Sequence, residues 1–204
     1  SGFLNPTLWA NWTSNIAGVG DFNSDGKDDI VFFDSFWGVA YVGLSDGMDF
    51  GAITSWGAVA GNSPSPPYAM QACRFDGATI GKVADFTGDG RADLFCYVPT
   101  SPDRQFVAIS QNTNFDSYVF GEGGDCASYL KSGADVNADG REDLFCMVPN
   151  GDLRSYRSGS GFYGADTLAS FCSVSEYSFG DWNGDGTTDA ACANNGRAAL
   201  RSGA

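Results

Sequence analysis

The chain has 204 residues, and its 25 acidic and 11 basic residues give a formal net charge of −14. Apolar residues make up 43% of the chain, enough for a large core, and this length suits a single all-β domain over residues 1–204. The few lysines and arginines form no basic cluster, which argues against a nucleic-acid partner. The absence of histidine excludes Ser-His-Asp and Cys-His catalysis. No apolar run approaches about 18 residues, so membrane insertion is not expected.

In chain order, one pattern of short segments is repeated four times. Each copy begins with a short run, as at 16–20 and 80–84, and continues through an acidic loop into a β-branched or aromatic run, which is the pattern of a hairpin. The second strands are expected at 30–33, 94–98, 144–148 and 190–193, and the third strands at 39–44, 106–109, 153–157 and 198–201. A fourth strand is expected to begin at Phe50, Phe115 and Phe162, and no stretch has sustained helical periodicity.

The acidic loops are the most specific feature of the sequence. They read D-x-[N/T]-x-D-G-x-x-D and occupy residues 21–29, 85–93, 135–143 and 181–189. Polar hairpin turns would use the same residue types, but four copies with carboxylates in register indicate metal binding. Oxygen ligands from loop positions 1, 3, 5 and 9, with the backbone carbonyl of position 7, suit Ca²⁺. The predicted ligands are Asp21, Asn23, Asp25, Lys27, Asp29; Asp85, Thr87, Asp89, Arg91, Asp93; Asp135, Asn137, Asp139, Arg141, Asp143; and Asp181, Asn183, Asp185, Thr187, Asp189.

These loops also account for much of the acidity of the chain. Twelve of the 25 acidic residues are aspartates at loop positions 1, 5 and 9. Up to four structural Ca²⁺ ions are expected, and they would bring the net charge from −14 to about −6. The acidity therefore reflects the predicted metal sites rather than a general anionic surface.

Six cysteines follow the repeat in the second, third and fourth copies. Their periodicity favours one bridge within each copy, although six cysteines permit about 15 pairings. Buried free thiols are the alternative, and bridges would indicate an oxidising, extracellular compartment. The chain also begins at Ser1 without a signal-like segment, as a mature secreted protein would. The expected pairs are Cys73–Cys96, Cys126–Cys146 and Cys172–Cys192.

The two ends of the chain suggest how the last copy is completed. In the first three copies a short segment that runs from a serine to a phenylalanine joins the third strand to the fourth, as from Ser45 to Phe50. The fourth copy ends before such a phenylalanine, and the segment 1–3 supplies one. Residues 1–10 are therefore expected to form the strand that closes the last unit. Four-stranded antiparallel units in a ring form a β-propeller. We expect four blades of four antiparallel strands, with one blade completed by residues 1–10. The alternative is an eight-bladed dimer in which two chains exchange their N-terminal strands.

The loop phrases V-G-D-F-N-S-D-G-K-D-D-I-V and A-D-F-T-G-D-G-R-A-D-L-F resemble those of FG-GAP and VCBS repeat proteins. That family includes the calcium-binding blades of integrin α-subunits and fungal lectins built as integrin-like propellers. The resemblance covers essentially the whole chain and implies a β-propeller that holds calcium in its loops. It does not fix the function, because the family serves adhesion, lectin, lyase-associated and accessory roles. Thr87 departs from the usual Asp or Asn at position 3, and four repeats are fewer than the seven typical of the family.

Binding is a better hypothesis than catalysis, because the carboxylates outside the loops occupy turn-like sequence and no reactive constellation adjoins them. We expect a secreted, calcium-stabilised, lectin-like protein that binds carbohydrate through aromatic and polar side chains. Core packing is the alternative role for most of the aromatic residues. The alternative functions are an extracellular carbohydrate-active enzyme (polysaccharide lyase or glycoside hydrolase) or its accessory domain, and an integrin-like adhesion module. The predicted ligand contacts are Trp37, Arg104, Arg154 and Tyr156.

Overall fold

The computed structural model describes residues 16–34, 39–58, 79–98, 104–122, 130–147, 152–160, 166–169, 177–194 and 197–201. Within these ranges the protein is all-β, with one short 3-10 turn, η2 (Ser158–Ser160), and no α-helix. No helix in the described part of the chain is long and apolar enough to cross a membrane. The predicted fold class is therefore confirmed at the level of antiparallel β-sheets.

Each sheet is built from one contiguous stretch of chain, and its strands pair in sequence order. Sheet 1 contains β1 (Ile16–Gly20), β2 (Asp29–Asp34), β3 (Val39–Gly43) and β4 (Thr54–Ala58). Sheet 2 contains β5 (Thr79–Ala84), β6 (Asp93–Val98), β7 (Arg104–Ser110) and β8 (Phe115–Glu122). Sheet 3 contains β9 (Leu130–Ala134), β10 (Asp143–Met147), β11 (Leu153–Tyr156) and β12 (Asp166–Ala169). Sheet 4 contains β13 (Tyr177–Gly180), β14 (Asp189–Asn194) and β15 (Arg197–Arg201).

The strands form where the sequence predicts them, with one shift. β-Branched and aromatic residues favour a half-buried pleated surface, and each acidic loop turns the first strand into the second. In sheet 1, however, the fourth strand begins at Thr54 rather than at Phe50. Phe50 forms only an isolated bridge with Ser45, because the four-residue turn between them is closed by its own hydrogen bonds. Phe162 lies outside the described residues.

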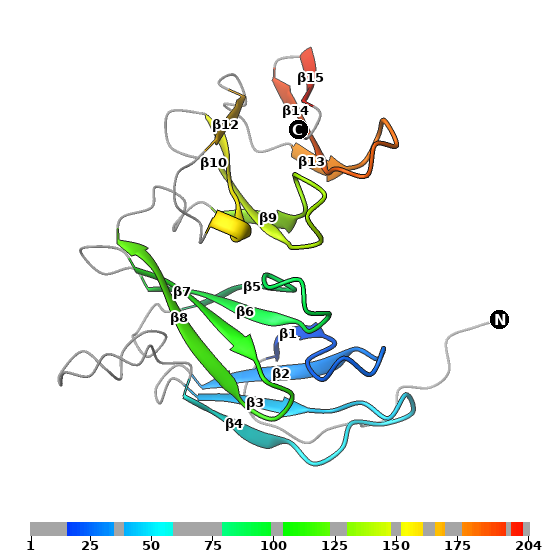
Figure 1. Ribbon diagram of the computed structural model, residues 1–204, viewed down its shortest axis with the longest axis vertical. Coiled ribbons are helices and arrows are strands. Elements are labelled where there is room, and N and C mark those ends of the chain that lie inside the picture. Colours follow the sequence, from blue (N-terminus) through cyan, green and yellow to red (C-terminus); the bar gives the residue numbers. More distant parts are fainter. Residues whose placement is uncertain are drawn as a thin grey trace.

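The four sheets follow one another in an open array (Figure 1). The first strands of neighbouring sheets lie side by side, β1 against β5 and β5 against β9. Over the described residues the sheets do not close into a barrel or a ring. The predicted closing strand at 1–10 lies outside the described residues, and sheet 4 has three described strands.

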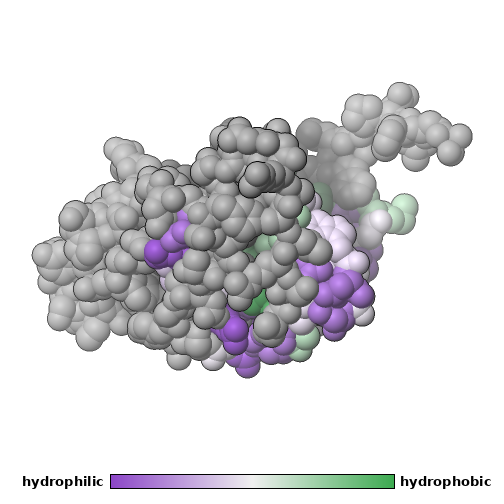
Figure 2. Space-filling view, turned by 90° about the horizontal axis from the view of Figure 1, so that it is seen from above, coloured by the Kyte–Doolittle hydropathy of each residue, from purple (hydrophilic) through white to green (hydrophobic). Residues whose placement is uncertain are grey.

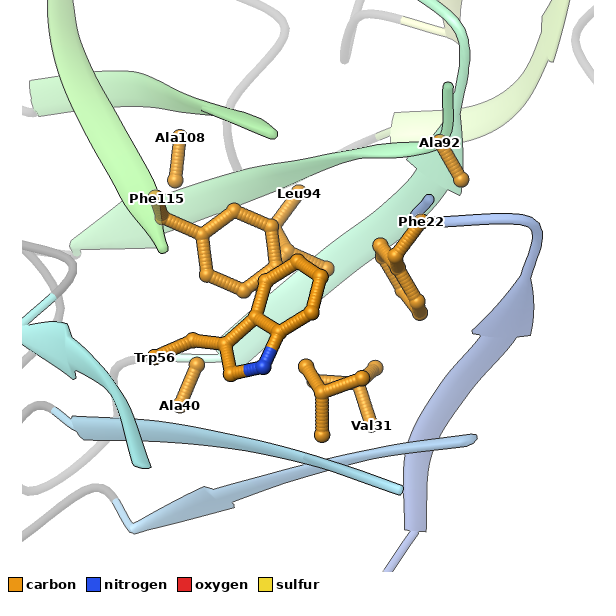
Figure 3. Packing of buried hydrophobic residues seen from close by; sticks show 9 residues of the cluster. Phe22, Val31, Ala40, Trp56, Ala92, Leu94, Ala108 and Phe115 are labelled. Carbon is orange, nitrogen blue, oxygen red and sulfur yellow. The ribbon is translucent and has the colours of Figure 1, made fainter. Parts of the chain in front are cut away.

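The best-packed core lies between sheets 1 and 2. Phe22, Trp56 and Phe115 are almost fully buried and meet in edge-on and tilted ring contacts, with centroids 5.3–6.2 Å apart (Figure 3). Val31 and Leu94 from the second strands complete this cluster. Because the aromatic residues come from both sheets, their burial holds the two sheets together.

Close packing against side chains of sheet 2 explains two glycines on β1. A Cβ atom at Gly18 would lie 2.2 Å from a methyl carbon of Val83 in β5. A Cβ at Gly20 would meet both Val83 and Ala92, at 3.1 and 2.7 Å. The first strand of sheet 1 therefore presents a flat surface on which side chains of sheet 2 rest.

Candidate metal loops

All four acidic loops lie at the same end of their sheets, on the right in Figure 1. From above, the described surface is largely hydrophilic, with small hydrophobic patches among the polar residues (Figure 2). The loops share one internal hydrogen-bond network, so the sequence repeat is also a geometric repeat. Loop positions are counted from the first aspartate of each loop, which is position 1.

The aspartate at position 9 is the buried anchor of each loop. Its four copies have no exposed surface: Asp29, Asp93, Asp143 and Asp189. One carboxylate oxygen accepts a hydrogen bond from the backbone N–H of position 2, at 2.9–3.2 Å in every loop. In the first three loops the other oxygen accepts from the backbone N–H of a serine just beyond the third strand or at its end, at 2.7–2.9 Å. This side chain therefore fastens the loop to the neighbouring strand connection.

Those serines are functional residues that the sequence analysis did not assign. They are Ser45, Ser110 and Ser158, and all three are buried. The hydroxyl of Ser158 also donates to Asp143, while that of Ser110 donates to the carbonyl oxygen of Phe22 in the preceding sheet. The signal in the sequence was the recurring serine-to-phenylalanine step, from which we inferred only how the last copy is completed.

The aspartate at position 1 organises the turn. One carboxylate oxygen accepts from the N–H of the glycine at position 6, at 2.7–3.0 Å in all four loops. The other accepts from the N–H of position 5 at 3.1–3.3 Å. The glycine has φ between +79° and +86° in each loop, a left-handed conformation that disfavours side chains. The glycine in the motif is therefore required by the turn itself.

Position 4 adopts the same left-handed conformation, although two of its four residues carry a side chain. Gly88 and Gly184 occupy it without strain, whereas Ser24 has φ +60° and Ala138 φ +55°. We expect Ala138→Gly to stabilise the chain by about 0.5–1 kcal/mol, since relief of the strain exceeds the added entropy of the unfolded chain. Chemical denaturation would measure the change. Ala17→Gly in β1, where φ is not positive, should have the opposite sign, and destabilisation by both would contradict the prediction.

In the first, second and fourth loops the carboxylate at position 5 interacts with the side chain of position 7. Lys27 Nζ lies 2.9 Å from Asp25 Oδ2, and the Arg91 guanidinium forms an ion pair with Asp89. The hydroxyl of Thr187 donates to Asp185 in the fourth loop. These hydrogen bonds hold the pKa of Asp25 and of Asp185 below its usual value. The carboxylates of Asp25 and Asp185 are thus kept ionised.

Burial has the opposite effect at position 9. Loss of solvation raises the pKa of Asp29 and Asp143, and raises that of Asp93 to about 7, although the backbone N–H donors oppose the shift. The neighbouring carboxylates at positions 1 and 5 raise the pKa of Asp93 further. A cation bound beside these groups would offset the cost of keeping them charged.

The raised pKa of Asp93 predicts a stability that depends on pH when calcium is absent. Between the ordinary pKa of 3.8 and about 7, the folded chain binds more protons than the unfolded chain. The free energy of unfolding should therefore fall as the pH rises through this window. We expect a higher transition temperature at about pH 5.5 than at about pH 8 in calcium-free buffer, measured by thermal denaturation. A transition temperature that increases over this range would contradict the prediction.

The donor set of the loops fits Ca²⁺, although the described residues hold no preformed group of three acidic or cysteine side chains around one point. The carboxylates at positions 1 and 9 accept hydrogen bonds from backbone N–H groups and retain further lone pairs. In the third loop, the side-chain oxygen of Asn137 is buried and has no hydrogen-bond partner. Its amide nitrogen donates to Asp139 at 3.1 Å, which leaves that oxygen available at position 3. An unsatisfied buried oxygen among carboxylates is what a hard cation would complete.

Neighbouring loops are joined to one another by one repeated hydrogen bond. The N–H at position 8 donates to the carbonyl oxygen of position 1 in the preceding loop: Ala92 to Asp21 at 2.6 Å, Glu142 to Asp85 at 2.8 Å and Thr188 to Asp135 at 2.8 Å. The four loops therefore form a continuous row. Changes in one loop are coupled to the backbone of the next.

Two of the four predicted ligand contacts, Arg154 and Tyr156, lie on β11 in sheet 3. Tyr156 is buried in sheet 3 with 8% of its surface exposed, so its ring offers little area to a ligand. Arg154 is half-buried and lies 3.8 Å from Asp152 in an ion pair. The backbone of Arg104 begins β7 in sheet 2, and Trp37 lies outside the described residues.

The predicted disulfides cannot be followed in the described structure. Cys96, Cys146 and Cys192 all lie on second strands, at equivalent places in sheets 2, 3 and 4. Their expected partners Cys73, Cys126 and Cys172 lie outside the described residues.

Comparison with known proteins gave one weak structural match. No family model matches the chain, and no curated protein matches it. The crystal structure of the biofilm matrix protein Bap1 of V. cholerae is similar with a TM-score of 0.32 and 19% sequence identity. The match covers 86% of this chain and 26% of Bap1, so the chain spans about a quarter of that protein.

Proposed function

We propose that the chain is a calcium-stabilised binding module in which each acidic loop holds one Ca²⁺ ion. The observation that supports this proposal is the hydrogen-bond network repeated in all four loops, in which the carboxylates of positions 1 and 9 accept backbone N–H groups of one tight turn. The unsatisfied oxygen of Asn137 and the raised pKa of Asp93 both favour an added cation. The ion would be structural, because it would neutralise a buried carboxylate and fix the turn.

Isothermal titration with CaCl₂ and thermal unfolding with and without a chelator test this proposal. Calcium at a hundredfold excess over the dissociation constant should stabilise the chain by about 3 kcal/mol for each site. Asp25→Asn removes an exposed carboxylate at position 5 and should abolish binding at the first loop. Asp28→Asn is the matched control, because it removes the same charge at exposed position 8 of the same loop. Equal calcium stabilisation in the two variants, or none in the native chain, would refute the proposal.

We further propose that the ligand is a carbohydrate and that the module is secreted, folds as a β-propeller and is not an enzyme. The support is the sequence: 14% aromatic residues, no histidine and carboxylates that lie mostly in turns. A glycan array with and without calcium tests ligand binding. Glycan retention supports the proposal, whereas product release from a bound polysaccharide would indicate a lyase or hydrolase. Retention of matrix proteins in place of glycans would indicate an adhesion module.

A further inference from the structure

We infer that Arg91 is a built-in counterion of the second loop and makes that loop the weakest of the four calcium sites, so that it fills last as the calcium concentration rises. The inference rests on the proposed calcium function of the loops. Arg91 occupies loop position 7, where only the backbone carbonyl is a predicted ligand. The side chain at this position can therefore differ between loops without the loss of a ligand.

The guanidinium of Arg91 is held in place from two sides. It forms an ion pair with the position 5 carboxylate of Asp89, and its Nε donates a hydrogen bond to the carbonyl oxygen of Ser110 at 3.0 Å. The backbone N–H of Arg91 donates to the other carboxylate oxygen of Asp89, also at 3.0 Å. The Arg91 side chain is only 21% exposed. The cation is therefore fixed against a carboxylate that a calcium ion would need.

The other three loops differ in this respect. Lys27 also pairs with the position 5 carboxylate of its loop, but its side chain is 40% exposed and its stem lies against Gly47 in an exposed turn. The hydroxyl of Thr187 makes the corresponding contact in the fourth loop without a charge. The side chain of Arg141 in the third loop extends toward the second loop, where a Cβ at Gly88 would lie 2.9 Å from its Cγ and 3.4 Å from its Nε. The second loop thus has its own cation and that of its neighbour beside it.

The charge of each loop supports the same ranking. Three aspartates and one arginine give the second loop a net charge of −2, with Ala92 at position 8. The first and third loops also contain one cation, but an acid at position 8, Asp28 or Glu142, brings their net charge to −3. The fourth loop has three aspartates, no cation and a net charge of −3. Because the attraction of a divalent ion grows with the negative charge of its site, the second loop should bind Ca²⁺ least tightly.

Position 3 acts in the same direction in the second loop. The other loops have asparagine at this position, and its amide offers a carbonyl oxygen. Thr87 offers a hydroxyl instead, which donates to Asp85 at 3.4 Å. The contributions of Thr87 and Arg91 can be separated by substitution, because only Arg91 carries a charge.

The glycines at position 6 report on the four loops separately. Each of their N–H groups donates to the position 1 carboxylate of its own loop, so a ¹H–¹⁵N NMR titration with CaCl₂ follows the occupancy of each loop. In the native chain the resonance of Gly90 should respond at a calcium concentration about tenfold higher than those of the other three glycines. The four reporters are Gly26, Gly90, Gly140 and Gly186.

Replacement of Arg91 by methionine should raise the calcium affinity of the second loop about tenfold, because it frees Asp89 and removes a positive charge while keeping the backbone carbonyl. Loss of the hydrogen bond to Ser110 would not by itself tighten calcium binding, so the direction of the change distinguishes a counterion from a structural support. Arg91→Lys keeps the charge and should keep the second loop weak. Thr187→Arg places the same cation in the fourth loop and should weaken calcium binding there about tenfold.

Arg157→Met is the matched control, because Arg157 is exposed just beyond the end of β11 and its loss should not change the titration of Gly90. Equal affinities at the four glycines of the native chain, or an unchanged response of Gly90 in Arg91→Met, would overturn this inference and leave the proposed calcium function standing. So would a Thr87→Asn variant that gives the second loop the affinity of the others while Arg91 is retained. No response to CaCl₂ at any of the four glycines would overturn both.

Discussion

Replacement of Asp93 by alanine should lower the free energy of unfolding by about 4 kcal/mol in calcium-free buffer. The carboxylate is fully buried and accepts hydrogen bonds from the N–H groups of Phe86 and Ser110, at 3.1 and 2.9 Å. Its removal leaves both donors without an acceptor in a place that water does not reach. Because each unsatisfied buried donor costs about 1–3 kcal/mol, the loss exceeds that of an ordinary surface substitution.

Urea denaturation of Asp93→Ala and Asp89→Ala compares the free energies of unfolding of two variants of the same loop. Asp89 occupies exposed position 5, so its replacement without calcium should change stability by less than about 1 kcal/mol. Asp93→Asn should resemble Asp93→Ala, because both carboxylate oxygens face N–H donors and an amide offers only one acceptor. Equal stabilities of the Asp89 and Asp93 variants would show that the position 9 carboxylate is not the anchor of the loop.

Replacement of Phe22 by alanine should cost about 3–5 kcal/mol. The ring is fully buried and packs edge-on against Trp56 of its own sheet and Phe115 of sheet 2, at 6.2 and 5.7 Å (Figure 3). The substitution creates a cavity between the two sheets and removes both aromatic contacts. The loss should appear as cooperative destabilisation of sheets 1 and 2 rather than as fraying of one strand.

Chemical denaturation of Phe22→Ala, with Met48→Ala as the control, measures the loss in the free energy of unfolding. Met48 is a large apolar side chain that is 84% exposed, so its truncation should change the stability by less than about 0.5 kcal/mol. Hydrogen exchange would show whether the amides of β2 and β6 lose protection together. Loss confined to sheet 1 would mean that the Phe22 ring does not hold the two sheets together.

Much of the fold could be predicted from the sequence because its signals are local. Each acidic loop marks the turn of a hairpin, so β1 was predicted with its observed bounds. The second strands lie at the apolar runs that follow the loops. The start of β4 was displaced because the turn after Ser45 has its own closing hydrogen bonds, which a count of strand spacing does not detect. The arrangement of the sheets depends on contacts between repeats, and such contacts leave little trace in a single sequence.

The site was only partly predictable for the same reason. The spacing of the aspartates and the glycine identified the loops. In the structure all four loops share one hydrogen-bond network. The sequence did not reveal that position 9 is an anchor for a distant serine N–H, since Asp29 and Ser45 lie 16 residues apart. Trp182 occupies the same loop position as Phe22, yet nearly half of its surface is exposed whereas Phe22 is fully buried. Tyr156 was predicted as a ligand contact from its place on the third strand of the third copy, and in the structure only 8% of its surface is exposed.

The contiguous origin of every sheet has an evolutionary consequence. No strand pairs with a strand from another copy of the repeat within the described ranges, and copies meet only through side chains, a serine hydroxyl and one backbone link. Duplication or deletion of a whole copy between sheets would therefore leave every strand register intact. A gene encoding such an array can change its number of copies in one recombination event, and the product keeps the strand pairing within each copy.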